Sequence, residues 1–391
     1  MKYAERMKRL GTESAFDVLV KAKSLEAKGM EVIHLEIGEP DFATPANICD
    51  AAIEAIRGGF THYNPSPGYP DVREVVSDYI NRTRGIKTNF RNVVITPGGK
   101  PIMFFTMLAL VNEGEEVIFP NPGFPIYESI INFIGAKAVP IYLREENDYR
   151  LDVKELKSLV TPKTKLIIIN SPQNPTGGVL THNDLEEIAG IAVEKDVWIL
   201  SDEIYSRIIY EAKFESVTQF PGAFERTIIL DGMSKTYAMT GWRLGYGVME
   251  ETLAAHVARL ATNSTSCTAS FSQIAMKEAI TGPQEESDKM VAEFKKRRDV
   301  IVAGLNKIDG FTCKKPLGAF YAYPNITGTG WKSKDLADFI LEKYGVAALS
   351  GTAFGSFGEG YMRFSYANSI ENIQKALSKV DAAIAKIKQS A

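Results

Sequence analysis

One lysine, Lys235, lies between a short apolar run, TIIL, and a cluster of glycines in the stretch TIILDGMSKTYAMTGWRLGYG, which spans residues 227–247. A lysine in a partly dry site near other cationic groups has a lowered pKa, so it can serve as a neutral nucleophile that condenses with an aldehyde. Arg243 follows in the same stretch, and its planar fork of N–H donors suits an anionic group of the same ligand. A surface ion pair is the alternative role for this arginine. The two residues together predict a ligand that carries both an aldehyde and an anion.

A carboxylate, Asp202, ends the apolar run VWILSD at residues 197–202. A buried carboxylate persists only beside a cation or a strong hydrogen-bond donor. The N–H group of a protonated pyridine ring is such a partner, and the carboxylate would in turn keep that ring protonated. The alternative role for Asp202 is to cap a helix that follows the run.

The glycine-rich stretch PGGK, residues 97–100, precedes a helical pattern that begins with PIMFFTMLAL. The free N–H groups at the start of such a helix could bind a phosphate, although a plain turn is the alternative. Pro101, rather than Ser or Thr, follows the lysine, so the stretch is not a nucleotide-binding P-loop. Pyridoxal phosphate has a group for each of these stretches: an aldehyde for the lysine, a ring nitrogen for the carboxylate and a phosphate for the N–H donors and the arginine.

Each of these stretches comes directly after a short apolar run, and helical patterns separate the runs. Runs that are apolar on both faces predict a mostly parallel sheet within an α/β layer. The runs lie at residues 93–96, 116–120, 165–170, 197–202 and 227–232. Ligands of open parallel sheets bind outside the carboxyl ends of the strands, because the loops and the helix N-termini converge there. We therefore expect the candidate residues to meet at one edge of the sheet.

Helical patterns flank the predicted sheet. Apolar residues at helical spacing predict a helix over 14–28 that stops at Gly29. A second helix is predicted to begin at Thr181, where Asp184 resembles the other half of a capping box. A long helix is predicted over 287–305, with the charges of its KKRRD run facing solvent. A last apolar line near the end of the sequence predicts one more helix.

Composition narrows the class of protein. At 391 residues the chain is long enough for two domains, and a cluster of Gly, Pro and acidic residues at 281–286 marks the approximate boundary between them. The 45 basic and 48 acidic residues give a formal charge of -3, which predicts neither nucleic-acid nor membrane binding. The few cysteines and histidines are scattered, so we expect no metal site. The charged N-terminus resembles no signal peptide, which predicts a cytoplasmic protein.

These motifs together resemble one family. The chain closely resembles the class I/II aminotransferases of pyridoxal-phosphate fold type I, and among them the prokaryotic aspartate aminotransferases. The resemblance runs through nearly the whole chain, and its main motifs are IGEPDF at 37–42, NPTG at 174–177, SDEIY at 201–205, SKTYAMTGWRLGY at 234–246 and YMRFSYA at 361–367.

The resemblance implies a fold and an activity. The implied fold is α/β, with a mostly parallel sheet flanked by helices and a second, smaller α+β domain. The large cofactor-binding domain would span residues 45–285, and the small domain would be built from both chain ends, residues 1–44 plus 286–391. The implied activity moves the amino group of an L-amino acid, aspartate or a broad range, to a 2-oxo acid such as 2-oxoglutarate by a ping-pong mechanism. The implied cofactor is pyridoxal 5'-phosphate.

The resemblance also assigns catalytic roles to motif residues. Lys235 resembles the lysine that forms a Schiff base with the cofactor and shuttles protons. Asp202 resembles the partner of the pyridine nitrogen. Asn174 and Tyr205 resemble the donors to the phenolic oxygen of the cofactor, and Tyr205 is counted with the catalytic residues.

The phosphate of the cofactor would be bound by a further set of residues. Gly99 and Lys100 would supply N–H groups, and Ser234 and Arg243 would add side-chain donors. Tyr63 resembles a tyrosine that is contributed to the phosphate site of the neighbouring subunit. A monomer would then be incomplete, so the resemblance implies a symmetric homodimer with shared active sites.

Substrate-binding residues follow from the same resemblance. Arg363 resembles the arginine that binds the α-carboxylate, and the backbone of Gly38 would lie against the same group. Phe124 stands where the family places an aromatic ring on the cofactor, and a phenylalanine there cannot donate a hydrogen bond to the substrate. Asn174 is also expected to contact the substrate.

The sequence leaves alternatives open. By resemblance, the same scaffold also hosts C–S β-lyases, aminocyclopropane-carboxylate synthases, decarboxylating acyltransferases, and aromatic and alanine aminotransferases. A non-catalytic ligand sensor would need a DNA-binding segment, for which the N-terminus is too short. The cation for a distal substrate carboxylate is not identified, with Lys8, Arg9 and the segment 10–20 as candidates because relatives fold this region over the site. The stretch at 263–273 resembles an interface loop near the substrate but does not name a side chain.

Overall fold

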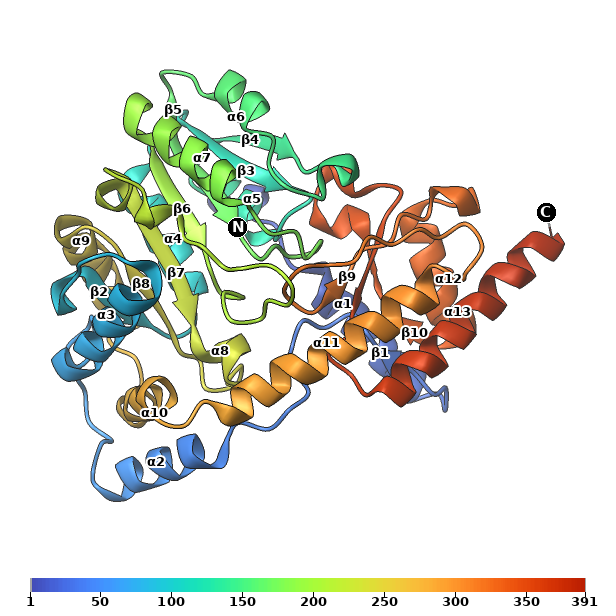
Figure 1. Ribbon diagram of the computed structural model, residues 1–391, viewed down its shortest axis with the longest axis horizontal. Coiled ribbons are helices and arrows are strands. Elements are labelled where there is room, and N and C mark those ends of the chain that lie inside the picture. The colour runs from blue at the N-terminus through green and yellow to red at the C-terminus, as the bar shows by residue number, and fades with distance from the viewer. Residues whose placement is uncertain (1, 391) are drawn as a thin grey trace.

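The computed structural model describes residues 2–390, and their arrangement centres on one large sheet (Figure 1). Within these residues the sheet has seven strands in the order β2-β8-β7-β6-β5-β3-β4. The strands are β2 (Val93–Thr96), β3 (Glu116–Asn121), β4 (Lys137–Tyr142), β5 (Thr164–Asn170), β6 (Trp198–Asp202), β7 (Thr227–Gly232) and β8 (Gly245–Val248). All neighbours run parallel except β8, which is antiparallel to β2 and β7. The mostly parallel α/β sheet and the five predicted strands are confirmed.

Sequence patterns did not predict strands β4 and β8. The sequence of β8 is GYGV, and its glycines carry no apolar side chain that would indicate a strand. A Cβ atom at Gly245 would lie 2.5 Å from backbone atoms of Gly98 and Gly99, so glycine is needed to bring β8 against the loop after β2. Strand β4 contains Pro140 and lies at the edge of the sheet, where one N–H group can be missing.

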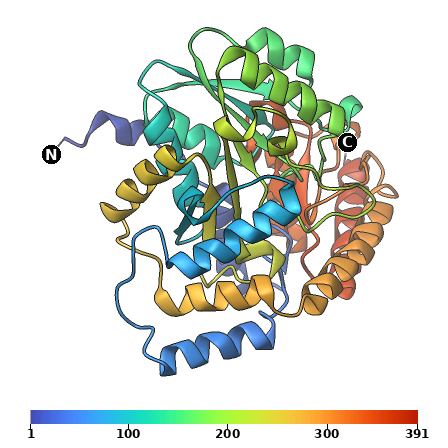
Figure 2. The same cartoon turned by 60° about the vertical axis from the view of Figure 1, so that its left-hand side comes forward.

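Helices cover both faces of the sheet. Alternate side chains of a strand point to opposite faces, so in β5 Ile168 packs on one face and Ile167 on the other. The first face is covered by α4 (Lys100–Leu110), α5 (Ile126–Phe133) and α9 (Glu251–Thr262). The second face is covered by α3 (Pro70–Arg84), α6 (Val153–Leu159), α7 (His182–Lys195) and α10 (Ser270–Thr281), with α2 (Ala46–Arg57) outside α10 (Figure 2). Burial on both faces explains why the strands are continuous apolar runs.

Both ends of the chain build a second core, on the right-hand side of Figure 1. Its helices are α11 (Glu285–Leu305), α12 (Ser333–Tyr344) and α13 (Ile370–Ser390). Its strands form two small sheets, one of β1 (Ile33–His34) and β10 (Val346–Ala347), the other of β11 (Leu349–Ser350), β12 (Met362–Ser365) and β9 (Tyr321–Ala322). The parallel pairing of β1 with β10 joins the start of the chain to its end. The domain limits at 45–285, and at 1–44 with 286–391, stay a prediction.

The predicted helices are present at the start, in the middle and at the end of the chain. They are α1 (Ser14–Glu26), α7, α11 and α13. The capping box of α7 is formed: the Asp184 N–H donates to Thr181 Oγ1 at 3.2 Å, and the Thr181 N–H donates to Asp184 Oδ2 at 2.8 Å. No helix within residues 2–390 is long and apolar enough to cross a membrane.

The basic run of α11 corrects one expectation. Its two lysines are exposed as predicted, but Arg297 and Arg298 are buried. The guanidinium carbon of Arg297 lies 4.7 Å from the centre of the Phe42 ring, and that of Arg298 lies 4.5 Å from the centre of the Tyr210 ring. Arg297 also donates to Asp41 Oδ1 at 2.6 Å. A guanidinium can stack on a ring and still reach a carboxylate, so burial of these arginines is tolerated where burial of lysines would not be.

A buried ion cluster ties helix α3 to the ends of strands β6 and β7. Arg84 Nε donates to Glu203 Oε2 at 2.8 Å, and Arg84 Nη2 donates to Asp231 Oδ2 at 3.1 Å. All three side chains are almost completely buried. Burial raises the pKa of Asp231 to about 7, although the charge of Arg84 opposes the rise. Because Glu203 follows Asp202 directly and Asp231 closely precedes Lys235, the cluster holds the segments that carry both candidates.

Replacing Arg84 by methionine should lower the free energy of unfolding by about 3–5 kcal/mol, because two buried carboxylates would lose their cation. The change is measured as the shift of the guanidinium midpoint in circular dichroism, at fixed protein and cofactor concentration. The matched control is Lys277→Met, since the ion pair of Lys277 with Asp71 is exposed and such pairs contribute little. Equally small shifts in both variants would show that the cluster does not anchor the strand ends.

Candidate active site

A cavity of about 470 Å³ opens at the carboxyl ends of strands β5, β6 and β7. Its volume lies in the range of sites that bind small molecules. Of the residues predicted from the sequence, it brings together Gly38, Gly99, Lys100, Phe124, Asn174, Asp202, Tyr205, Ser234, Lys235, Arg243 and Arg363. The sheet, its flanking loops and the second core all contribute to its wall.

Asp202 is the buried carboxylate of this cavity. Tyr127 donates its hydroxyl hydrogen to Asp202 Oδ2 at 2.6 Å, and the Ile204 N–H donates to Oδ1 at 3.3 Å. No helix follows β6 directly, so Asp202 is not a helix cap. Burial raises the pKa of Asp202 to about 6, while both hydrogen bonds oppose the rise. Within residues 2–390 no cationic side chain forms an ion pair with it, so a cation from a ligand would stabilise its charged form.

Lys235 lies in the short helix α8 (Met233–Thr236), directly after β7. Its amine donates to the backbone oxygen of Gly38. Burial lowers the pKa of Lys235 to about 8; the charge of Glu39 opposes this effect and that of Arg363 adds to it. A substantial fraction of the amine is therefore neutral near physiological pH, which is the state that a nucleophile or a general base requires.

Arg363 is a buried cation on strand β12. Its Nη1 donates to Asn174 Oδ1 at 3.1 Å, and its Nη2 donates to the backbone oxygen of Glu36. The guanidinium lies over the ring of Tyr321, with its carbon 4.4 Å from the ring centre. Its Nε is buried without a hydrogen-bond partner, and no carboxylate within the described residues forms an ion pair with Arg363. Burial lowers its pKa, so an anionic ligand would be bound strongly here.

One corner of the cavity suits a second anion. Gly99 and Ser234 line it together with Arg243. The N–H groups of Gly99 and Lys100 are left for an anion there, because Pro101 has no N–H and the Ile102 N–H donates to the Gly99 backbone oxygen at 3.0 Å. Arg243 Nη1 donates to the Thr240 backbone oxygen at 2.7 Å. The guanidinium also lies against Gly98, where a Cβ atom would collide with Nη2. Gly98 itself has a φ of 89°, so only glycine fits this turn without strain.

Sequence reasoning missed two tyrosines of the site. Tyr321 places its hydroxyl 2.7 Å from the hydroxyl of Tyr205, and a Cβ atom on Gly38 would collide with it. Burial raises the pKa of both phenols, so they stay protonated and can donate hydrogen bonds. The second missed residue, Tyr127, follows the predicted strand 116–120 closely. Its position after a parallel strand could have indicated that it lies near the ligand-binding edge of the sheet. No motif marks Tyr321, because only folding brings it to the site.

Tyr63 is not part of the cavity in its own chain. Its side chain is 90% exposed, and it lines a separate surface hollow with Phe60 and Thr268. The segment that carries it is held in place, since Ser270 Oγ donates to the His62 backbone oxygen at 2.6 Å. An exposed aromatic side chain on an ordered segment is available to a second molecule.

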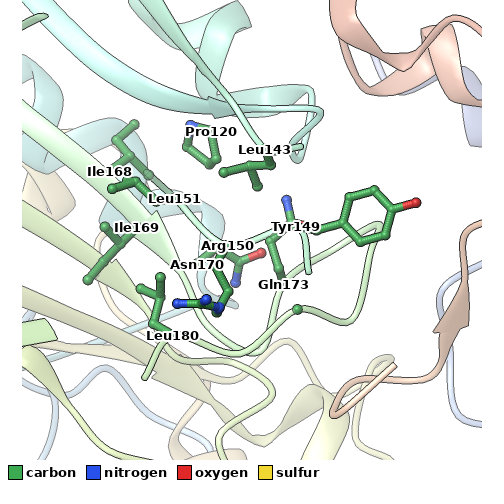
Figure 3. Close-up of a pocket in the computed structure, with 11 residues that line it drawn as sticks. Pro120, Leu143, Tyr149, Arg150, Leu151, Ile168, Ile169, Asn170, Gln173 and Leu180 are labelled. Carbon is green, nitrogen blue, oxygen red and sulfur yellow. The ribbon is translucent and has the colours of Figure 1, made fainter. Parts of the chain in front are cut away.

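A second, much smaller cavity lies beneath the end of β5. Its volume is about 20 Å³, which is room for about one water molecule. Figure 3 shows Leu143, Leu151 and Ile168 around it. It is too small for a cofactor or an amino acid. Among residues 2–390, no three His, Cys, Asp or Glu side chains gather into a possible metal site.

The lowered pKa of Lys235 makes the amine unusually reactive at moderate pH. In cofactor-free protein, its acetylation by acetic anhydride should reach half its maximal rate near pH 8, since burial disfavours the charged form. The measurement is competitive isotopic labelling followed by mass spectrometry of the peptides, with lysines on the protein surface as the internal reference. A midpoint at the value of a model lysine, about 10.4, would contradict the lowered pKa.

Comparison with known proteins gives a consistent result. The family profile described as aminotransferase class I and II matches residues 30–380. The chain is 41% identical over 386 residues to the aspartate aminotransferase of Pyrococcus horikoshii, covering 97% of both chains. It is 40% identical over 360 residues to aromatic-amino-acid aminotransferase 2 of Thermococcus litoralis, covering 91% of this chain and 92% of that one. The structure of aspartate aminotransferase from Thermus thermophilus with maleate superposes with a TM-score of 0.94 at 33% identity, covering 98% of this chain and 100% of that one. The chain therefore belongs to the class I and II aminotransferases and is a pyridoxal-phosphate-dependent transaminase of fold type I.

Proposed function

We propose that the enzyme transfers the amino group of a broad range of L-amino acids, aspartate and aromatic amino acids among them, to a 2-oxo acid such as 2-oxoglutarate. The observation that carries this proposal is that Lys235, Asp202 and Arg363 line one cavity, and within the described residues none of them has an oppositely charged partner. Unpaired charges in a partly dry site are costly, so a ligand that brings opposite charges is needed. Relatives named as aspartate and as aromatic-amino-acid aminotransferases support the broad range.

The residues of the cavity fit the ring of pyridoxal phosphate. Asp202 faces the cavity without a cation, which suits the protonated ring nitrogen. Asn174 and Tyr205 line the same wall, and we assign them as donors to the phenolic oxygen. Phe124 would lie on the ring, and it is held edge-to-face against Tyr127 with the ring centres 5.6 Å apart.

The anion-binding corner fits the phosphate. We assign the N–H groups of Gly99 and Lys100 to it, because they lie at the start of helix α4 where the helix dipole favours an anion. The side chains of Ser234 and Arg243 line the same corner and would add a hydroxyl donor and a positive charge. Gly98 allows the approach of Arg243, since any larger residue would collide with it.

The chain supplies proton transfer and the cofactor supplies an electron sink. Pyridoxal phosphate stabilises the electrons that remain when a proton leaves the α-carbon of a bound amino acid. Lys235 Nζ has a pKa of about 8 in this cavity, so it can accept the α-proton as a neutral amine and return it as an ammonium. A cation beside Asp202 lowers the pKa of that carboxyl, so Asp202 stays ionised during the reaction.

Substrate orientation would come from Arg363. Two of its nitrogens are fixed by Asn174 and by the backbone oxygen of Glu36, so the guanidinium is preorganised for the α-carboxylate. Binding one end of the substrate at Arg363 and reacting at Lys235 restricts the α-carbon to a narrow range of positions. Orientation of this kind lowers the barrier by several kcal/mol.

Purified holoenzyme given L-aspartate or L-phenylalanine with 2-oxoglutarate should form glutamate, measured by chromatography of the products. Lys235→Ala should lower kcat/KM at least about a hundredfold, the usual contribution of a positioned general base. Lys277→Ala is the matched control, because that lysine lies on the surface in an exposed ion pair. Unchanged turnover in Lys235→Ala would refute the assigned role.

A homodimer is part of the proposal. Tyr63 is exposed in the single chain, and exposed apolar side chains at Ile53, Ile56 and Phe60 lie close to it in the sequence. Burial of such a patch favours association. We therefore propose that Tyr63 completes the phosphate site of a second copy of the chain. The cytoplasmic location and the lack of a nucleic-acid partner stay predictions.

Tyr63→Ala should weaken binding of pyridoxal phosphate roughly tenfold to a hundredfold, the range for a lost hydrogen bond to a charged group. Mixed with Lys235→Ala protein under conditions that allow subunit exchange, it should regain tight binding and activity at one site of each hybrid dimer. That site combines an intact lysine of one copy with an intact tyrosine of the other. Failure of the mixture to regain activity, or a monomer in light scattering, would contradict a shared site.

A further inference from the structure

The active-site cavity contains an ion pair that the proposed mechanism does not use. Glu13 immediately precedes helix α1, and its carboxylate pairs with the amine of Lys100 at the start of α4. Both residues line the same cavity as Lys235 and Arg363. The side chain of Glu13 is 18% exposed and that of Lys100 is 47% exposed, so the pair lies where the cavity meets solvent.

The wall around this pair is mostly apolar. Ala15 and Phe16 from α1, Met103 from α4, and Phe124 line the cavity beside it. The amine of Lys100 lies 5.6 Å from the centre of the Phe124 ring, within the range of a cation–π contact. An apolar wall with a neutralised charge suits a substrate side chain that carries no charge.

Only one of the cationic side chains that line the cavity among the described residues has no role in the proposed function, and it could bind an acidic side chain of a substrate. Within the described residues the lining cations are Lys100, Lys235, Arg243 and Arg363. The proposed function uses Arg363 for the α-carboxylate, Arg243 for the phosphate and Lys235 for the proton. Lys100 is therefore the cation left for a carboxylate at the far end of a substrate, and Glu13 already neutralises it.

The negative charge of Glu13 also reaches the reacting groups. It acts to raise the pKa of both Lys235 and Arg363, against the lowering by burial that dominates at each residue. A substrate carboxylate that approaches Lys100 would therefore meet a like charge as well as an occupied amine. Repulsion between like charges is a common way in which a binding site discriminates against the wrong ligand.

The segment that carries Glu13 is lightly packed. The preceding helix η1 (Glu5–Arg9) buries no side chain, and Figure 2 shows it projecting from the body of the protein. Among the described residues of α1, Ala22 alone is buried. A hydrogen bond from the Gly11 N–H to Ser129 Oγ at 3.0 Å holds the loop between the two helices. Segments with few buried contacts open at low cost, so Glu13 can leave Lys100 without unfolding the site.

We propose that Glu13 is a specificity-determining residue that closes Lys100 to acidic substrate side chains. With the pair intact, the cavity presents an apolar wall and a neutralised Lys100 to aromatic and aliphatic side chains. A substrate with a distal carboxylate has to displace Glu13 before it reaches Lys100. The inference rests on the proposed function, and it narrows the preferred donors to aromatic and aliphatic L-amino acids over aspartate and glutamate.

The test removes the charge of Glu13 and keeps its size. In the holoenzyme, the half-reaction with one amino acid at a time is followed by the absorbance of the bound cofactor. Glu13→Gln should raise the ratio of kcat/KM for L-aspartate to that for L-phenylalanine about tenfold, because a like charge is removed and Lys100 is freed. The Kd of succinate, an unreactive dicarboxylate, should fall in parallel, while that of 3-phenylpropionate should stay within about twofold.

Two further variants distinguish the specific effect of the Glu13–Lys100 pair from a general effect of removing negative charge. Glu5→Gln removes a carboxylate from the same N-terminal segment, where Glu5 pairs with Lys8 in solvent. In this variant the ratio of kcat/KM values and the Kd of succinate should stay unchanged. Adding Lys100→Met to Glu13→Gln should abolish the gain in succinate affinity.

Three outcomes would overturn the inference: a wild-type preference for aspartate over phenylalanine, an unchanged substrate ratio in Glu13→Gln, or an unchanged succinate affinity in that variant. Turnover of neither amino acid by the wild type would instead count against the proposed function. In that case the succinate titration still decides on Glu13, because it measures binding alone.

Discussion

The carboxyl end of the central sheet holds charges that the chain itself does not neutralise. Asp202 and Arg363 are buried in the cavity that opens there, and Lys235 lines the same cavity with a lowered pKa. A folded protein tolerates such charges only when a ligand supplies the opposite charge or when the surrounding structure keeps the charged groups from moving into solvent. The fold can therefore be understood as the scaffold that keeps these groups in place until cofactor and substrate arrive.

An ion cluster and an ion pair with opposite properties lie beside this site. The Arg84 cluster is buried and joins α3 to the ends of β6 and β7, so it fixes the backbone that carries Asp202 and Lys235. The pair of Glu13 with Lys100 is partly exposed and lies on a lightly packed segment. Buried pairs resist exchange and exposed pairs form and break readily. The backbone that carries the reacting groups is therefore rigid, whereas the part of the cavity that would contact the substrate side chain can rearrange.

The sequence predicted what depends on local pattern. The apolar runs that became β2, β3, β5, β6 and β7 were recognisable because burial on both faces demands such runs, and the cavity residues were recognisable from motifs at their ends. Strand β8 was missed because Gly245 is chosen for a close backbone approach rather than for burial. Tyr321 and the partner of Lys100 were missed because no local pattern marks contacts between residues so distant in sequence. The burial of Arg298 shows the same limit, since only the fold supplies the Tyr210 ring beneath it.

The pairing of β1 with β10 has a consequence for the order of assembly. Translation proceeds from the N-terminus, so every strand of the central sheet has left the ribosome before Val346, the partner of Ile33, has been made. The central layer can condense early, whereas β1 and α1 lack their partners in α12 and β10 until the last part of the chain has been made. Closing so long a loop is slow. A nascent chain interrupted after α11 would thus hold Lys235 and Asp202 but lack Arg363, and with it the cation that we assign to the α-carboxylate of the substrate.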